Sequence, residues 1–173
     1  IRVGSLVETV GINAFSNSAS LKTVEIYGPV KTISANTFFG CKRLEQVTLP
    51  STLTTIGASA FSGCRTLARI SIPSGVTYIG NSAFSNCWSL TSITIPSSLT
   101  AVYSYTFSEC RSLMSITIPK KVKSVASYAF ARCVSLTSVS IPTSVTSIGT
   151  HAFEYCTSLT SVTIPTSIRS LGM

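Results

Sequence analysis

The chain contains no aspartate, and acidic side chains are scarce. Its 173 residues include five acids, all of them glutamate, and a single histidine, His151. A Ser-His-Asp triad therefore lacks its acid, and a glutamate in that role would have to converge on one imidazole. No carboxylate pair has a spacing typical of acid–base catalysis, and no glycine-rich phosphate loop follows a strand. The sequence predicts a protein that is not an enzyme and needs no cofactor.

Long apolar runs and targeting signals are also missing. No run approaches the roughly 18 residues that a membrane-spanning helix needs, and neither a signal peptide nor an Asn-x-Ser/Thr sequon is present. Residues 1–3 fit the middle of a repeat unit, and residues 171–173 stop inside one. Repeat arrays normally end in atypical capping units. We therefore expect a single domain over residues 1–173 that is an uncapped piece of a longer protein.

Charge is sparse but one-sided. Charged residues make up 10% of the chain against 45% hydrophobic, and the formal net charge is +8. A basic balance favours an acidic partner such as an anionic glycan, a membrane surface or a nucleic acid. The basic residues are scattered, however, with the densest group at Lys120, Lys121 and Lys123, and no aromatics are interleaved with them. We expect weak attraction to polyanions and no specific nucleic-acid recognition.

A 23-residue period organises the whole chain. Leucine, cysteine and proline recur at this step, and no residue is inserted or deleted across the array. The phenylalanines at this step are Phe15, Phe38, Phe61, Phe84, Phe107, Phe130 and Phe153. A single unit cannot bury its own apolar side, whereas stacked copies form one continuous core. The sequence therefore predicts a solenoid of about seven units.

Each unit begins with a strand pattern. The stretch 92–95 alternates polar and apolar residues, as a strand with one buried face does, and Pro96 ends it because it lacks an N–H. Beyond it, Leu99 and Val102 lie three apart and Phe107 five further. That spacing favours a tight turn or a short helical turn over a second long strand.

The combined pattern resembles a known family. The spacing L-x-x-I-x-I-P-x-x-L-x-x-I, with A-F-x-x-C as in Ala129 to Cys133, resembles the BspA-like leucine-rich repeats. The resemblance implies an α/β-type horseshoe arc, with a parallel sheet on the concave face and loops or short helical turns on the convex face. Ser18, Tyr27 and Pro29 depart from the repeat, so the first rung is expected to be less regular.

Family members are mostly surface or secreted proteins of bacteria and protozoan parasites that adhere to host proteins. The resemblance thus implies a non-catalytic protein-binding or adhesion module at the cell surface or outside the cell. Its partner would be a protein, such as a host extracellular protein or receptor. Two alternatives remain open, a structural spacer and an intracellular regulatory scaffold. The second is favoured if the cysteines must stay reduced.

Six cysteines also follow the period. Zinc sites need close pairs of thiolates, and here each cysteine is alone in its unit. Stacking places them in a column at the edge of the core, where free cysteine behaves as a small apolar residue. We expect a reduced structural ladder. Disulfides between adjacent rungs remain the alternative, because the Cα separation would permit them.

Two groups of side chains are candidate contact sites. On the outward side of the strands, positions from Ser92 onward are almost all Ser and Thr. Larger groups gather in the first rungs, at Lys22, Glu25, Glu45, Gln46 and Arg69. Because solenoids bind through the concave face, these five are candidate partner contacts. The alternative is ordinary surface variation.

The second group lies in the column after the cysteines. Trp88 falls between Arg65 and Arg111 of adjacent rungs, which permits cation–π stacking, and Trp and Arg are enriched in binding hot spots. The alternative is that the arginine stems merely cover an exposed indole. His151 shares its own column with Tyr105 and Tyr128, which predicts an aromatic stack rather than a catalytic site.

Overall fold

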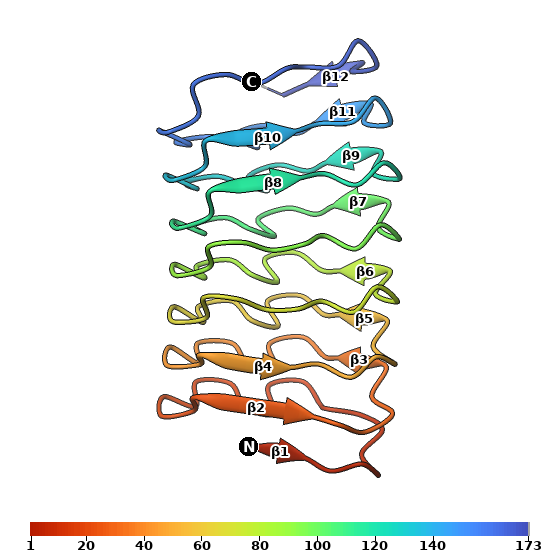
Figure 1. Cartoon of the computed structure of the whole chain (residues 1–173), viewed down its shortest axis with the longest axis vertical. Helices are drawn as coiled ribbons and strands as arrows, with labels where there is room; N and C mark the ends of the chain where they lie inside the picture. The colour runs from red at the N-terminus through yellow and green to blue at the C-terminus, as the bar shows by residue number, and fades with distance from the viewer. Residues whose placement is uncertain (173) are drawn as a thin grey trace.

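The computed structural model describes residues 1–172, and these form a stack of similar rungs. We number the rungs 1 to 7 by their phenylalanines, from Phe15 to Phe153. Figure 1 shows the rungs piled along the long axis, with the N-terminal end at the bottom and the C-terminal end at the top. All strand pairs are parallel and join residues one period apart, such as Thr23 with Gln46.

One side of the stack, here the front sheet, carries strands at the predicted position in several units, but the stretch 92–95 and its equivalent 69–72 are not strands. Its strands are β1 (Arg2–Val3), β2 (Thr23–Ile26), β4 (Gln46–Thr48), β8 (Ser115–Thr117) and β10 (Ser138–Ser140). They alternate as expected, since Ile116 is buried while Ser115 and Thr117 are exposed. The order is β1-β2-β4 in one part and β8-β10 in the other.

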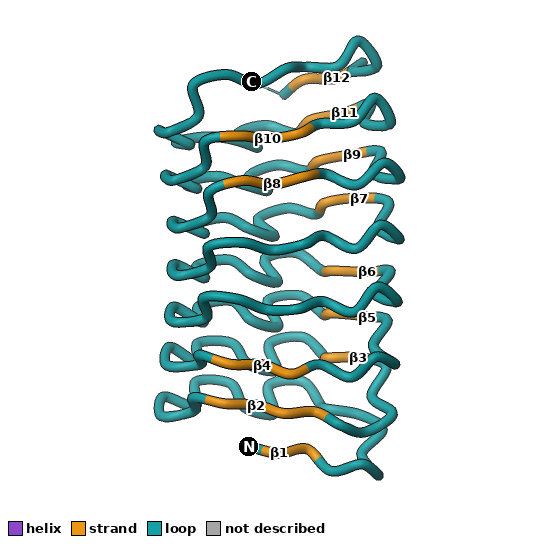
Figure 2. Tube along the Cα trace, in the orientation of Figure 1, coloured by secondary structure: helices purple, strands orange, loops and turns teal. Residues whose placement is uncertain are grey.

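The opposite side, here the back sheet, has short strands where helical turns were expected. Its strands are β3 (Thr32–Ile33), β5 (Thr55–Ile56), β6 (Tyr78–Ile79), β7 (Ala101–Val102), β9 (Ser124–Val125), β11 (Ser147–Ile148) and β12 (Ser170–Leu171). Figure 2 shows only strands and loops, and no helix occurs within residues 1–172. The α/β assignment and the short helical turns were therefore wrong. No described segment is a helix able to cross a membrane.

A physical reason for the error lies in the spacing of neighbouring rungs. A helix is about 10 Å wide, whereas strands in a sheet are about 4.8 Å apart, so helices on one side would force the stack to fan out. With strands on both sides, neighbouring rungs are the same distance apart in the front sheet and in the back sheet. The rungs in Figure 1 accordingly follow one another in a nearly straight line.

The core between the two sheets is a set of aligned columns. The seven phenylalanine rings stack in one file, with neighbouring centroids 5.3 to 5.7 Å apart. Phe38, Phe61 and Phe84 have no exposed surface. Rung 1 is regular despite its sequence departures, because Phe15 stacks on Phe38 and β2 is the longest strand.

Candidate functional site

The cysteines form the buried ladder that the spacing predicted. All six are free and buried. Each thiol donates a hydrogen bond to the phenylalanine carbonyl of the preceding rung, for example Cys110 Sγ to Phe84 O at 3.3 Å. The same carbonyl oxygen also accepts from the backbone N–H of Cys87, so both of its lone pairs are used. No cluster able to hold a metal ion occurs among residues 1–172.

Burial also makes these thiols poor nucleophiles. Desolvation raises the pKa of the Cys87 thiol to about 12 and that of Cys156 to about 11. The thiolate is the reactive form, so a raised pKa suppresses reaction near neutral pH. The ladder is a structural feature and not a catalytic one.

His151 lies in an aromatic stack, as its column predicted. Its ring centroid is 4.9 Å from that of Tyr128, which in turn lies 4.8 Å from Tyr105. His151 Nδ1 is 3.6 Å from a carboxylate oxygen of Glu154. No serine or cysteine nucleophile is paired with this imidazole in the described structure.

The front face carries the first group of predicted site residues. Glu45, Gln46 and Arg69 line one shallow hollow of that face, and Lys22 is exposed on the neighbouring rung. Glu25 is already engaged, because its carboxylate accepts a hydrogen bond from Arg2 Nε at 2.6 Å. The structure therefore brings three of the five residues together around one hollow.

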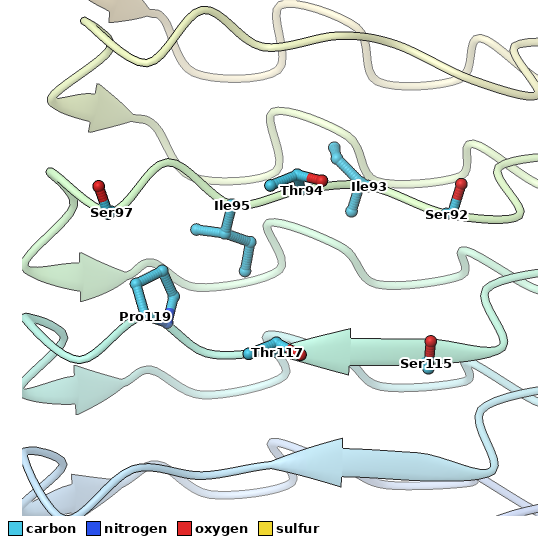
Figure 3. Close-up of a pocket in the computed structure, with 8 residues that line it drawn as sticks. All are labelled: Ser92, Ile93, Thr94, Ile95, Ser97, Ser115, Thr117 and Pro119. Atoms are coloured by element: carbon cyan, nitrogen blue, oxygen red, sulfur yellow. The ribbon is translucent and has the colours of Figure 1, made fainter.

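Further along the front face the side chains are small hydroxyls and isoleucines. Figure 3 shows a hollow lined by hydroxyls such as Ser92, Thr94, Ser115 and Thr117, together with isoleucine side chains. No charged side chain lines it. It offers weak hydrogen bonding and little to orient a specific ligand.

The second predicted group is assembled as its column implied. The guanidinium carbon of Arg65 lies 3.9 Å from the ring centroid of Trp88, and that of Arg111 lies 4.5 Å from it. The arginines come from the rungs before and after, so the indole is held between two cations. The indole Nε1 is enclosed and has no hydrogen-bond partner within residues 1–172. Trp88 therefore contacts its neighbours through the faces of its ring and not through its N–H.

Three further residues extend this arrangement. Arg111 donates two hydrogen bonds to Glu109 Oε2, at 2.9 and 2.7 Å. The other carboxylate oxygen of Glu109 is 3.8 Å from Arg132 Nε, and Arg132 lies 5.0 Å from the centre of the Tyr155 ring. We call the resulting set the arginine–aromatic strip: Arg65, Trp88, Arg111, Glu109, Arg132 and Tyr155.

Sequence reasoning missed the second half of the strip. Glu109, Arg132 and Tyr155 lie in the column before the cysteines, whereas the predicted residues lie in the column after them. Glu109 links the two columns. A signal existed, because rungs 1 to 4 have Asn17, Gly40, Gly63 and Asn86 in that column before it changes to large side chains.

Comparison with known proteins identifies the repeat. The family model of the BspA type leucine rich repeat region matches residues 1–114 and 77–173, with six copies. The chain belongs to this family. No curated protein sequence matches it.

Solved structures of leucine-rich repeat proteins share the fold. A leucine-rich repeat protein from Bacteroides ovatus is 37% identical with a TM-score of 0.94, covering 99% of this chain and 44% of its own. The T. pallidum leucine rich repeat protein is 30% identical with a TM-score of 0.85, covering 92% of this chain and 77% of its own. The chain thus spans less than half of the B. ovatus protein.

A third structure adds a description of location. A leucine rich cell surface protein from Faecalibacterium prausnitzii is 25% identical with a TM-score of 0.50. The match covers 92% of this chain and 62% of that protein.

Proposed function

We propose that this BspA-type repeat array is a non-catalytic protein-binding and adhesion module of a cell-surface or secreted protein. The observation that carries the proposal is the arginine–aromatic strip. Its arginines and Tyr155 are exposed, and Trp, Tyr and Arg are the residues that dominate binding hot spots. Stacking already restricts the arginine side chains, so a partner loses less side-chain entropy when it binds them.

The remaining chemistry supports a binding role over catalysis. Thiols are buried with raised pKa values, and the single imidazole is stacked on Tyr128. The shallow front hollows lack the convergent polar groups that active sites use. What the fold does supply is a rigid, extended surface, which is how solenoids present contacts to macromolecules.

A surface location and a host protein partner are parts of the same proposal. The family and the F. prausnitzii cell-surface protein support the location. The free cysteines do not favour an intracellular scaffold, because burial and hydrogen bonding shield each thiol from oxidants in any compartment.

Cell binding tests the proposal directly. The labelled chain should bind intact mammalian epithelial cells saturably, and protease treatment of the cells should remove the binding while glycosidase treatment should not. Antibody to the chain should also label intact cells of the encoding organism. Absence of any saturable binding would leave the structural spacer as the better account.

Two sets of variants then locate the contact surface. The first combines Arg65→Ala with Arg111→Ala in the strip, and the second combines Lys22→Ala, Glu45→Ala, Gln46→Ala and Arg69→Ala on the front face. We expect the strip set to weaken cell binding more than the front set at equal thermal stability. The reverse result would move the contact to the front hollow around Arg69.

A further inference from the structure

The strip has a surplus of positive charge that its own carboxylate does not balance. Arg65 stacks on Trp88 and has no ion-pair partner within residues 1–172, and Lys42 and Arg43 on the rung before are exposed. Glu109, half-buried, is the one acid in the strip and is shared between Arg111 and Arg132. The charge calls for an anionic partner.

The backbone gives an independent indication that these side chains serve something other than folding. Glu109, Arg132 and Tyr155 have φ of 62°, 61° and 54°, in the left-handed region that large side chains disfavour. Asn17 and Asn86 occupy the same column in other rungs with similar φ. Folding is thus satisfied by asparagine or glycine, and strained residues of this kind cluster at functional sites.

The spacing of the cations identifies the form of the anion. The guanidinium carbons of Arg65 and Arg111 lie 3.9 and 4.5 Å from the same ring centroid, so they are no more than about 8 Å apart. In an extended peptide, residues two apart point to the same face and are separated by about 7 Å, at about 3.3 Å per residue. Carboxylates two residues apart would therefore meet both guanidiniums in register.

We propose that the strip binds an extended acidic segment of the partner protein, laid along the solenoid axis, with carboxylates two residues apart on Arg65 and Arg111. This inference rests on the proposed protein-binding function and specifies its partner. The guanidiniums keep N–H groups free for a carboxylate, while the indole fixes their planes. Since guanidiniums cover both sides of the Trp88 ring, no indole face is left for a sugar to stack on.

Trp88 makes the site easy to observe, because it is the one tryptophan in the chain. Its fluorescence should change saturably when a short peptide with two glutamates separated by one residue, and Ser or Gly elsewhere, is titrated in at physiological salt. A peptide of identical composition in which the two glutamates are adjacent, and so point to opposite faces, should bind more weakly. Equal affinity for the two peptides would overturn the register argument.

Variants that remove positive charge inside and outside the strip separate its contribution from general electrostatics. Arg65→Gln and Arg111→Gln should each lower the affinity for the spaced peptide about tenfold, as expected for loss of one charge-assisted contact. Lys120→Gln with Lys121→Gln removes exposed charge elsewhere and should change affinity less than twofold, a factor of little energetic weight. An equal loss in this control would overturn the proposal.

Two further measurements test whether Tyr155 has only a structural role and whether the strip binds a sulfated glycan. Tyr155→Asn should leave the free energy of unfolding unchanged or higher, because asparagine tolerates a positive φ. The same variant should weaken binding of the peptide. Heparin that outcompetes the peptide at Trp88 would instead assign the strip to a sulfated glycan and overturn the proposal. If the spaced peptide fails while strip variants still lose cell binding, this inference is wrong and the protein-binding function stands.

Discussion

At the scale of single residues, each rung depends on two positions with left-handed backbone. They lie two residues before and two residues after each core phenylalanine, and their N–H groups donate to the next rung, as from Asn86 to Ser108 O at 2.8 Å. Gly63 is at one of these positions, with φ of 78°. The repeat therefore needs particular backbone freedom at fixed places.

A matched pair of glycines tests this requirement. Gly63→Ala should lower the free energy of unfolding by about 1–2 kcal/mol, since an alanine is strained at positive φ. Gly75→Ala should raise it by about 0.4–1 kcal/mol, because the added Cβ would meet only ordinary contacts and the unfolded chain loses freedom. Urea denaturation measures both, and equal effects would contradict the role given to Gly63.

The same scale shows what the sequence could foretell about the site. An unbroken 23-residue period places Arg65, Trp88 and Arg111 on consecutive rungs, so their stacking followed from counting alone. The link through Glu109 could not be counted, because it joins two different columns across a bend of the chain. Side-chain reach, and not register, decides such contacts.

At the scale of elements, the two sheets are interrupted and the phenylalanine column is not. Within residues 1–172 no backbone hydrogen bond joins 69–72 to 92–95, and β6 is not paired with β7. Across the same region Phe61 N donates to Ala83 O at 2.8 Å and Phe84 N to Thr106 O at 2.9 Å. The turns around the phenylalanines hold the middle of the stack together.

Hydrogen exchange should reveal this division. We expect the amides of Phe61, Phe84 and Asn86 to exchange slowly and those of 70–72 and 93–95 to exchange much faster, because the latter lack ladder partners. Amides of β2, which pairs with β1 on one side and with β4 on the other, provide the comparison within one experiment. Uniform protection along the front sheet would contradict the interruption.

The short strands of the back sheet could not be predicted from the sequence pattern. Pairs such as Thr32-Ile33 and Thr55-Ile56 are too short for a two-residue period to be distinguished from one turn of helix. Only pairing with the next rung makes them strands. The strands β4, β8 and β10 were predictable because alternating residues precede a proline, whereas β2 is followed by Tyr27.

At the scale of the whole molecule, the cysteine ladder couples stability to alkaline pH. Burial raises the pKa of Cys87 to about 12 and that of Cys156 to about 11, whereas the same thiols ionise near 9 when exposed. Between these values the unfolded chain has lost protons that the folded chain keeps. Stability is therefore fully present below about pH 8.5 and falls as pH rises toward 11–12.

The free energy of unfolding from urea denaturation should accordingly decline between pH 9 and pH 11, by up to about 1.4 kcal/mol per pH unit for each thiol involved. Tyrosine and lysine also titrate in this range, so the variant Cys87→Ala with Cys110→Ala is the control. Its decline should be shallower than that of the parent chain. Parallel curves for the two proteins would show that the thiols are not the cause.

The parallel stacking of rungs also determines how the molecule responds to mechanical load. The hydrogen bonds between rungs run along the axis that joins the two ends of the described chain (Figure 1). A pull on those ends therefore loads the bonds of one rung at a time and peels it away, instead of shearing many at once. Each release frees 23 residues, or about 80 Å of extended chain. An array tethered between two bodies would lengthen in uniform steps and absorb tension that a single cooperative domain would transmit until it failed.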